Sequence, residues 1–201
     1  MANVRKFTKD NVYNGKEIKM DEGMEADCGI LDAIEESVDR AVSGGAGRIV
    51  LYDILLPRQY AEQNNANEKF KLIQADICRH QKRVDGSDAT PRYIAVRDAM
   101  SESPVFKVAM FLPEETNYDR EEFESNGSYI TDGKLTDWKA YREHDLMALC
   151  EKHGVMVKET LPLDGTQEAS EEAFYVASEM AMVKSKPRTR AERMLFRSRN
   201  S

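Results

Sequence analysis

The sequence lacks the features that mark several classes of protein. It has no run of about 18 apolar residues, the minimum for a membrane-spanning helix. Its first 20 residues, MANVRKFTKDNVYNGKEIKM, lack the apolar core of a secretory signal. Its cysteines, Cys28, Cys78 and Cys150, stand far apart with no C-x-x-C pair, which argues against a disulfide framework and a zinc ribbon. We therefore expect a soluble cytoplasmic protein with no membrane partner.

Common catalytic and cofactor-binding motifs are also missing. No Walker A, G-x-G-x-x-G, G-x-S-x-G or H-E-x-x-H pattern occurs, and the histidines His80, His144 and His153 are scattered. Gly44 and Gly45 precede an apolar strand pattern, whereas a phosphate-binding loop follows a strand and opens a helix. We expect no cofactor and no metal site.

Positive charge gathers at the C-terminal end of a chain whose net charge is −7. Residues 184–201 hold one acidic residue and seven basic ones, Lys184, Lys186, Arg188, Arg190, Arg193, Arg197 and Arg199. These cations could neutralise nucleic-acid phosphates in a salt-sensitive way. Alternatively, they form a solvated tail, or a helix end that folds over the acidic body. The sequence leaves both interpretations open.

Hydrophobic periodicity predicts helices and strands in mixed order. The predicted elements are helices within 29–45, 59–83, 135–154 and 168–184, and strands within 48–57, 92–99, 104–113 and 155–163. This order favours an α+β, ferredoxin-like fold with an antiparallel sheet of four to five strands packed with helices. We expect a polar N-terminal segment at 1–28, one domain at 29–186 and a basic C-terminal tail at 187–201.

Five segments in order resemble the inovirus Gp2 and YfjJ/YagK family of phage and prophage proteins, which is related to rolling-circle replication initiators of the HUH type. The resemblance covers roughly residues 46–199. It is carried by IVLYDILLP with Asp53 and Pro57, RYIAVRDA with Tyr93, Arg97 and Asp98, Trp138, GVMVKETLP from Gly154, and SEMAMVKSK followed by RMLFRSR.

The resemblance implies a nicking site that this chain has lost. In active relatives a His-apolar-His pair on one strand grips a divalent metal, and these two places fall on Val105 and Lys107. Valine has no donor atom and a protonated lysine repels a cation. The family's tyrosine nucleophile and the lysine after it align with Glu179 and Met182.

Tyr175 offers an alternative nucleophile, because it lies four residues before Glu179 and would share its helix face. The simpler interpretation is that Phe174 and Tyr175 both pack the helix on the sheet. Without a histidine pair to polarise a phosphate, Tyr175 would have little to act with.

Because the resembled family consists of phage and prophage proteins, the resemblance also implies a function for a member that has lost its catalytic residues. We expect a non-catalytic protein of a phage, prophage or phage satellite in a bacterial host. It would engage a phage protein, for example the small terminase subunit, and so interfere with or redirect helper-phage DNA packaging or replication. The alternatives are a replication initiator that nicks single-stranded DNA and a DNA-binding regulator that uses the basic C-terminal end. The sequence does not predict an oligomeric state.

Overall fold

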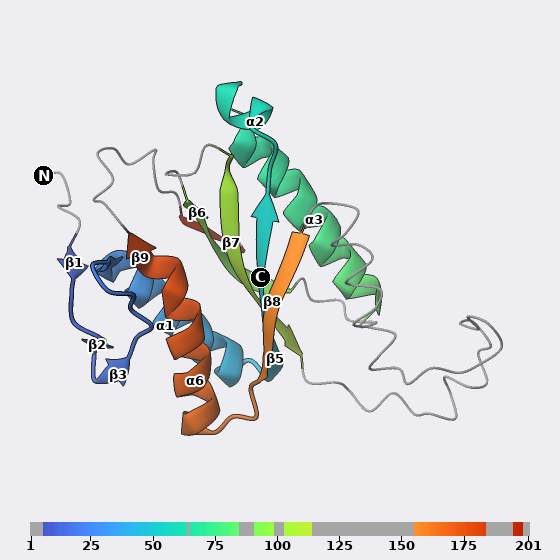
Figure 1. Ribbon diagram of the computed structural model, residues 1–201. Coiled ribbons are helices and arrows are strands. Elements are labelled where there is room, and N and C mark those ends of the chain that lie inside the picture. Colours follow the sequence, from blue (N-terminus) through green and yellow to red (C-terminus); the bar gives the residue numbers. More distant parts are fainter. Residues whose placement is uncertain are drawn as a thin grey trace, which may run out of the picture.

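A five-stranded antiparallel sheet forms the centre of the protein (Figure 1). The computed structural model describes residues 6–63, 65–84, 91–98, 103–113, 155–183 and 195–198. The strand order is β10-β6-β7-β5-β8. The strands are β5 (Ala46–Leu55), β6 (Arg92–Asp98), β7 (Val105–Pro113), β8 (Val155–Pro162) and β10 (Leu195–Arg197). The predicted α+β class, with an antiparallel sheet packed with helices, is confirmed.

Strand β5 is interior to the sheet because it bonds to β7 on one side and to β8 on the other. The apolar run of β5 explains its interior position, because side chains on both of its faces are buried. Its residues Ile49, Val50, Tyr52 and Ile54 are all at most 2% exposed. The predictions that this strand is buried and that β6 pairs with β7 are both confirmed.

Helices cover both faces of the sheet (Figure 1). Helices α1 (Cys28–Ser43) and α6 (Gln167–Ser178) share one apolar core with Ile49 and Leu51 of β5. Helix α3 (Ala66–Val84) shares the other core with the residues of β5 that alternate with them. In that second core the rings of Phe70 and Phe106 stack with centroids 4.3 Å apart.

The ends of α1 follow from its flanking residues. The Asp27 side chain accepts hydrogen bonds from the backbone N–H groups of Gly29 and Ile30, a cap that contributes about 1 kcal/mol. After the helix, Gly45 takes a φ of 75°, which a residue with a Cβ rarely adopts. The chain then turns directly into β5.

The N-terminal segment, expected to be polar and loosely packed, builds two small sheets. Strands β2 (Val12–Tyr13) and β3 (Lys16–Glu17) pair with each other, and β4 (Glu25–Asp27) lies between β1 (Phe7–Thr8) and β9 (Met182–Val183). Ile18 and Ala26 are buried in the core beside α1 and α6. The segment is therefore integrated into the fold on the α6 side.

Two predicted helices differ from the observed ones. The helix expected at 59–83 is divided into α2 (Gln59–Glu62) and α3, with Asn65, a residue of low helix propensity, just before α3. The helix expected at 168–184 ends at Ser178 and continues as the 3-10 turn η1 (Glu179–Ala181), because Met182 and Val183 extend to pair with β4. The helix expected at 135–154 lies outside the described residues.

Part of the predicted basic tail belongs to the sheet. Strand β10 pairs with β6 along Leu195, Phe196 and Arg197. The Phe196 ring packs near Phe70 and Phe106, at centroid distances of 4.9 and 5.8 Å. An aromatic residue amid the arginines therefore anchors this segment.

Candidate functional site

Three neighbouring strands place charged side chains on the sheet face that α6 covers. On β5, Asp53 lies opposite Lys107 of β7 on one side and opposite Met156 of β8 on the other. The register between β5 and β8 slips by one residue at Leu51/Tyr52, where Lys158 is the additional residue. A bulge of this kind re-aims a side chain, and here Lys158 reaches Asp53 with an Nζ–Oδ2 distance of 3.0 Å.

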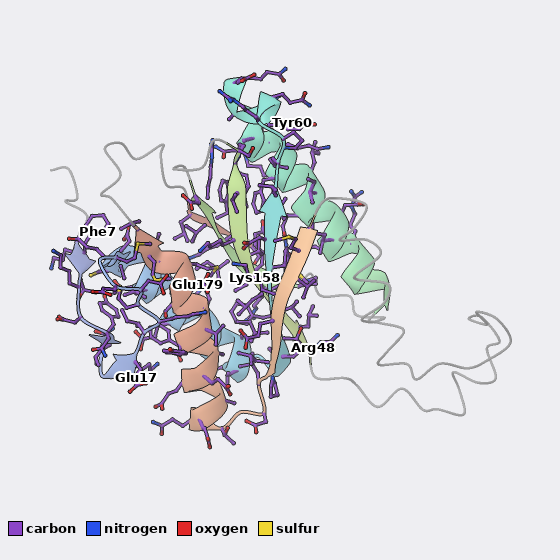
Figure 2. All side chains as sticks on the ribbon, in the orientation of Figure 1. Phe7, Glu17, Arg48, Tyr60, Lys158 and Glu179 are labelled. Atoms are coloured by element: carbon purple, nitrogen blue, oxygen red, sulfur yellow. The ribbon has the colours of Figure 1, made fainter. Side chains whose placement is uncertain are left out.

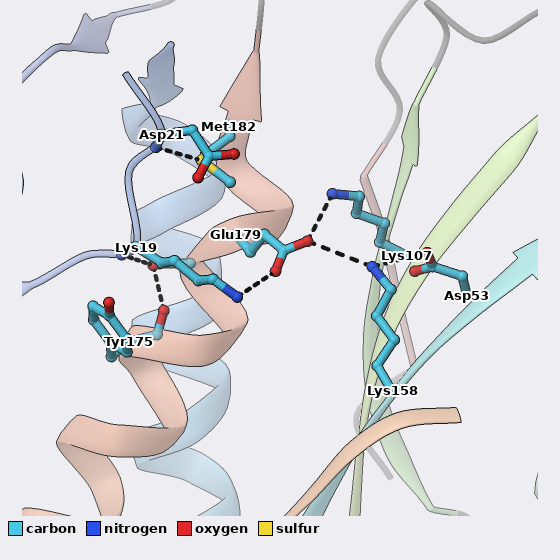
Figure 3. Close-up of polar contacts among 9 residues, drawn as sticks. Lys19, Asp21, Asp53, Lys107, Lys158, Tyr175, Glu179 and Met182 are labelled. Atoms are coloured by element: carbon cyan, nitrogen blue, oxygen red, sulfur yellow. Dashed lines mark hydrogen bonds and ion pairs between the residues drawn. The ribbon is translucent and has the colours of Figure 1, made fainter. Parts of the chain in front are cut away.

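Glu179 lies at the centre of a cluster of lysines (Figure 3). Its Oε2 accepts a hydrogen bond from Lys19 Nζ at 2.8 Å, and its Oε1 accepts from Lys107 at 3.3 Å and from Lys158 at 3.4 Å. Figure 2 shows Lys158 and Glu179 pointing toward each other between β8 and the end of α6. We call these four residues together with Asp53 the ion cluster.

The end of α6 explains why Glu179 faces the sheet. The Ser178 hydroxyl donates to the Tyr175 carbonyl at 2.5 Å and accepts from the Lys19 backbone N–H at 2.8 Å. These bonds tie the N-terminal segment to the last turn of the helix. They hold Lys19 on one side of Glu179 while the two strand lysines approach from the other side (Figure 3).

The charges of the ion cluster reinforce one another. Burial alone would raise the pKa of Glu179, but the hydrogen bond from Lys19 and the charges of Lys107 and Lys158 outweigh it and lower the pKa to about 2. The bond to Glu179 is the main reason that the pKa of Lys19 is raised. Burial would lower the pKa of Lys158, but Asp53 and Glu179 raise it.

This protonation pattern limits the chemistry of the ion cluster. Lysines with raised pKa values stay protonated at neutral pH, so they supply neither a free amine nucleophile nor a general base. A carboxylate whose pKa is about 2 is a weak base. The arrangement is suited to holding charges in place and presenting ammonium groups.

A small cleft of about 40 Å³ lies beside the ion cluster, between the sheet and α6. Its walls combine Asp53, Lys107 and Lys158 with apolar side chains, including Leu51 and Val176. A volume of this size accommodates a side chain or one or two water molecules. It is too small for a nucleotide or a comparable cofactor.

Four residues, Val105, Lys107, Glu179 and Met182, stand where the resembled family has its metal-binding and nucleophilic residues. The structure brings two of these four, Lys107 and Glu179, into direct contact. Lys107 and Glu179 are 72 residues apart in sequence and 3.3 Å apart in space. Val105 lies two residues before Lys107 on β7, at the edge of the same face. Met182 does not join the ion cluster, because it lies in β9 and its sulfur accepts a hydrogen bond from the Asp21 backbone N–H.

The packing predicted for Tyr175 is wrong. Phe174 is fully buried, but Tyr175 is 39% exposed, and its ring points away from the sheet lysines (Figure 3). The four-residue spacing from Glu179 therefore does not bring the Tyr175 ring to the lysines that Glu179 contacts (Figure 3).

Of the seven basic residues at the C-terminal end, the described part of the chain contains Arg197. Its guanidinium pairs with Glu36 of α1 at 2.7 Å. This contact is of the kind expected if the basic end folds onto the acidic body. Six of them fall outside the described residues, namely Lys184, Lys186, Arg188, Arg190, Arg193 and Arg199.

Sequence reasoning did not identify Lys19 or Lys158 as site residues. Lys158 belongs to a segment predicted as a strand, but its direction depends on a bulge that the apolar pattern does not reveal. Lys19 acts on a residue 160 positions away, for which the sequence carries no local signal.

Within the residues that the structure describes, no group of three or more His, Cys, Asp or Glu side chains is arranged to hold a metal ion. None of the helices in the described ranges is long and apolar enough to cross a membrane.

Comparisons of this chain with protein-family models, with curated proteins and with solved structures gave no match.

Proposed function

We propose that this chain is a non-catalytic binding protein built on the fold of a replication initiator. The observation that carries the proposal is the pairing of Lys107 with Glu179 inside the ion cluster. The resemblance implies a metal ligand at the first position and a nucleophile at the second, and these two groups must meet in an active enzyme. Their contact supports the resemblance, and their identities support the loss of the reaction.

The chemistry of the replaced residues also supports the proposal. Val105 offers no donor atom to a metal, and the Lys107 ammonium group takes the place of an imidazole. Glu179 is already engaged by three ammonium groups and has a pKa of about 2. Its carboxylate would also be a poor replacement for tyrosine in a stable covalent link to DNA.

The proposed partner is a phage-encoded protein, with the small terminase subunit as the candidate that the resemblance favours. In this proposal the chain acts in the cytoplasm of a bacterium that carries a phage, prophage or phage satellite. By binding its partner it interferes with or redirects the packaging or replication of helper-phage DNA. A fold freed from catalysis can use its surface for binding, because sites rather than folds determine function.

We expect no metal-dependent cleavage when the protein is incubated with single-stranded origin DNA and Mg²⁺ or Mn²⁺. Reaction products are separated on denaturing gels, and the Tyr175→Phe variant is run in parallel. The two proteins should behave identically, because the Tyr175 ring lies away from the sheet lysines (Figure 3). Cleavage by the wild-type protein that Tyr175→Phe abolishes would establish the replication-initiator alternative.

Affinity capture tests the partner directly. The tagged protein is recovered from nuclease-treated lysates of phage-infected and uninfected bacteria, washed at high salt and examined by mass spectrometry. We expect a stoichiometric phage protein from infected cells alone, because contacts with apolar components resist salt whereas phosphate contacts do not. Recovery of nucleic acid alone, lost on nuclease treatment, would favour the DNA-binding alternative.

A further inference from the structure

Strand β10 lies on the edge of β6 and makes contacts on both faces of the sheet. Residues 195–197 pair antiparallel with β6, and Ser198 forms a reciprocal pair of hydrogen bonds with Tyr93. The Tyr93 N–H donates to the Ser198 hydroxyl at 3.2 Å, and the Ser198 N–H donates to the Tyr93 carbonyl at 3.1 Å. Successive side chains of a strand point to opposite faces. Phe196 therefore contacts the α3 side, whereas Arg197 contacts α1.

The aromatic surface that receives Phe196 does not depend on β10. The rings of Phe70 and Phe106 stack at 4.3 Å, and the Arg97 guanidinium lies 5.9 Å from the Phe106 centroid. Phe196 is a third ring, tilted by 51° against Phe70 and by 59° against Phe106. Tilted aromatic pairs are favourable beyond the area that they bury. Without Phe196, the stacked pair would remain and would offer a place for another aromatic ring.

The carboxylate that receives Arg197 also has a second partner. Glu36 of α1 accepts a hydrogen bond from Arg40 with Oε1 at 2.5 Å and one from Arg197 with Oε2 at 2.7 Å. If Arg197 moved away, Glu36 would keep Arg40 and would have one oxygen available for another cation. The geometry of this contact therefore selects a positive side chain next to the aromatic one.

The other charges on this face are compatible with a cation at Glu36. Arg92 donates to the Arg40 backbone carbonyl at 2.8 Å, and Lys107, on the next strand, is paired with Glu179. Asp39 borders the same surface as Arg92, and Asp98 lies on the same face of β6 as Arg92, because residues at even spacing on a strand share a face. The nearby cations are thus engaged, and the two acidic residues favour a positive ligand.

The contacts of β10 are few and partly exposed. Leu195 is 38% exposed, and the side chains of Arg197 and Glu36 are 39% and 44% exposed, so their ion pair contributes little to stability. Strand β6 would stay in the sheet without β10, because it pairs with β7 along its whole length. Segments with few buried apolar contacts open locally without unfolding the rest of a protein. We expect β10 to separate from β6 in this way.

We propose that the edge of β6 is a peptide-binding site for an extended segment in which an aromatic residue is followed directly by arginine. Phe196 and Arg197 are its resident ligand, and a partner segment of the same chemistry replaces them when β10 separates. In strand addition, main-chain hydrogen bonds supply affinity and the pockets for alternate side chains supply specificity. The inference rests on the proposed function, because it assigns this surface and this sequence preference to the contact with the phage partner.

Fluorescence anisotropy with a labelled peptide of residues 192–201, ERMLFRSRNS, tests the site. The peptide is added to the full-length wild type and to full-length Phe196→Ala/Arg197→Gln, in which the resident ligand is weakened. Glu36→Gln is then added to this double variant. The matched control adds Asp39→Asn instead, which removes one negative charge from another exposed position of α1. A second peptide has alanine in place of the phenylalanine.

We expect Phe196→Ala/Arg197→Gln to bind the peptide at least about tenfold more tightly than the wild type, whose own segment competes at a high effective concentration. Alanine in place of the peptide's phenylalanine should weaken binding at least about tenfold. Glu36→Gln should weaken it about threefold, as expected for an exposed ion pair, and Asp39→Asn should leave it unchanged.

Hydrogen exchange of the isotope-labelled wild type, followed by NMR, tests the separation of β10 without any substitution. The amide protons of residues 195–198 should exchange much faster than those of β5, which require global unfolding. Saturating unlabelled peptide should accelerate their exchange further, because it keeps the resident segment displaced. The β5 amides should not respond to the peptide.

Three results would overturn the peptide-binding site: no binding to Phe196→Ala/Arg197→Gln, equal binding of the alanine-substituted peptide, or exchange of the 195–198 amides at the rate of β5. If the double variant does not fold, the exchange measurement on the wild type decides. Each of these results would leave the proposed function standing if a phage protein is still captured from infected cells. DNA cleavage that depends on Tyr175 would instead remove the proposed function, whatever the peptide does.

Discussion

Replacing Val105 and Lys107 together with histidine should give the chain a Zn²⁺ site. Residues two apart on a strand point to the same face, so the two imidazoles would lie side by side on β7. Glu179 already lies 3.3 Å from the Lys107 ammonium group and would supply a third ligand. Two histidines and one carboxylate are a common ligand set for Zn²⁺. The two substitutions should therefore be sufficient to create a metal site.

Thermal unfolding measured with and without ZnCl₂ provides the readout. A ligand that binds only the folded state stabilises it by about 2.7 kcal/mol when its free concentration is 100 times its dissociation constant. The midpoint of the double-histidine variant should therefore rise with Zn²⁺, whereas those of the wild type and of the single variant Val105→His should change little. Adding Glu179→Gln to the double variant should weaken Zn²⁺ binding, because the third ligand loses its charge.

If Zn²⁺ does not raise the unfolding midpoint of the double-histidine variant, the result would argue against the geometry on which the proposed function rests. Lys19 and Lys158 remain beside Glu179 in this variant and would repel a cation, so the same measurement is repeated with Lys19→Gln and Lys158→Gln added. If Zn²⁺ still has no effect, the side chains at 105, 107 and 179 do not converge on one point. If the variant binds Zn²⁺ and the binding depends on Glu179, the three positions have the arrangement that the resemblance implies for metal and nucleophile. The experiment therefore tests the alignment without requiring any catalytic activity.

Strong local signals account for the parts of the fold that the sequence predicted. The dense apolar run around Ile49–Ile54 could only be accommodated inside a sheet, and helical spacing from Ile30 to Val42 required a helix with one apolar face. Gly44 and Gly45 ended that helix where expected. In these segments local preference and tertiary packing favour the same structure.

The mistaken predictions arose where distant contacts overrode the local pattern. Apolar periodicity continues from Phe174 through Ala181, yet α6 ends at Ser178 because pairing of Met182 with Ala26 requires extended backbone. The N-terminal segment looks polar, yet Ile18 packs in the core. Neither contact leaves a signal within a window of neighbouring residues.

The candidate site was predictable only in part for the same reason. The resemblance selected Lys107 and Glu179 from separate motifs, and the fold places them together. Lys19 and Lys158, which complete the ion cluster, were missed because their contributions depend on a long-range contact and a strand bulge. The two residues that the resemblance aligns with a nicking site were thus identified from the sequence, whereas the two lysines that complete the ion cluster were not.

Replacing Glu179 with glutamine should lower the free energy of unfolding at pH 7 by about 1–2 kcal/mol. Glutamine keeps the shape and one acceptor oxygen, so the charge is the main change. Lowering a pKa from 4.5 to about 2 corresponds to roughly 3 kcal/mol at 1.36 kcal/mol for each unit. Solvent screening reduces this figure, because the side chains of the cluster are between 14% and 41% exposed. Urea unfolding of both proteins measures the difference.

The effect of this substitution should depend on pH in one direction. The folded-state pKa of Glu179 lies below its unfolded value, so its contribution is complete above about pH 4.5 and is lost as the pH falls toward 2. The stability difference between the wild type and Glu179→Gln should therefore be constant near neutrality and shrink toward zero in acid. Glu172→Gln, the same change at an exposed position of α6, should alter stability by less than about 0.5 kcal/mol at any pH. A difference that persists unchanged to pH 3 would show that Glu179 contributes packing rather than charge. The ion cluster would then no longer explain why the lysines gather at this point.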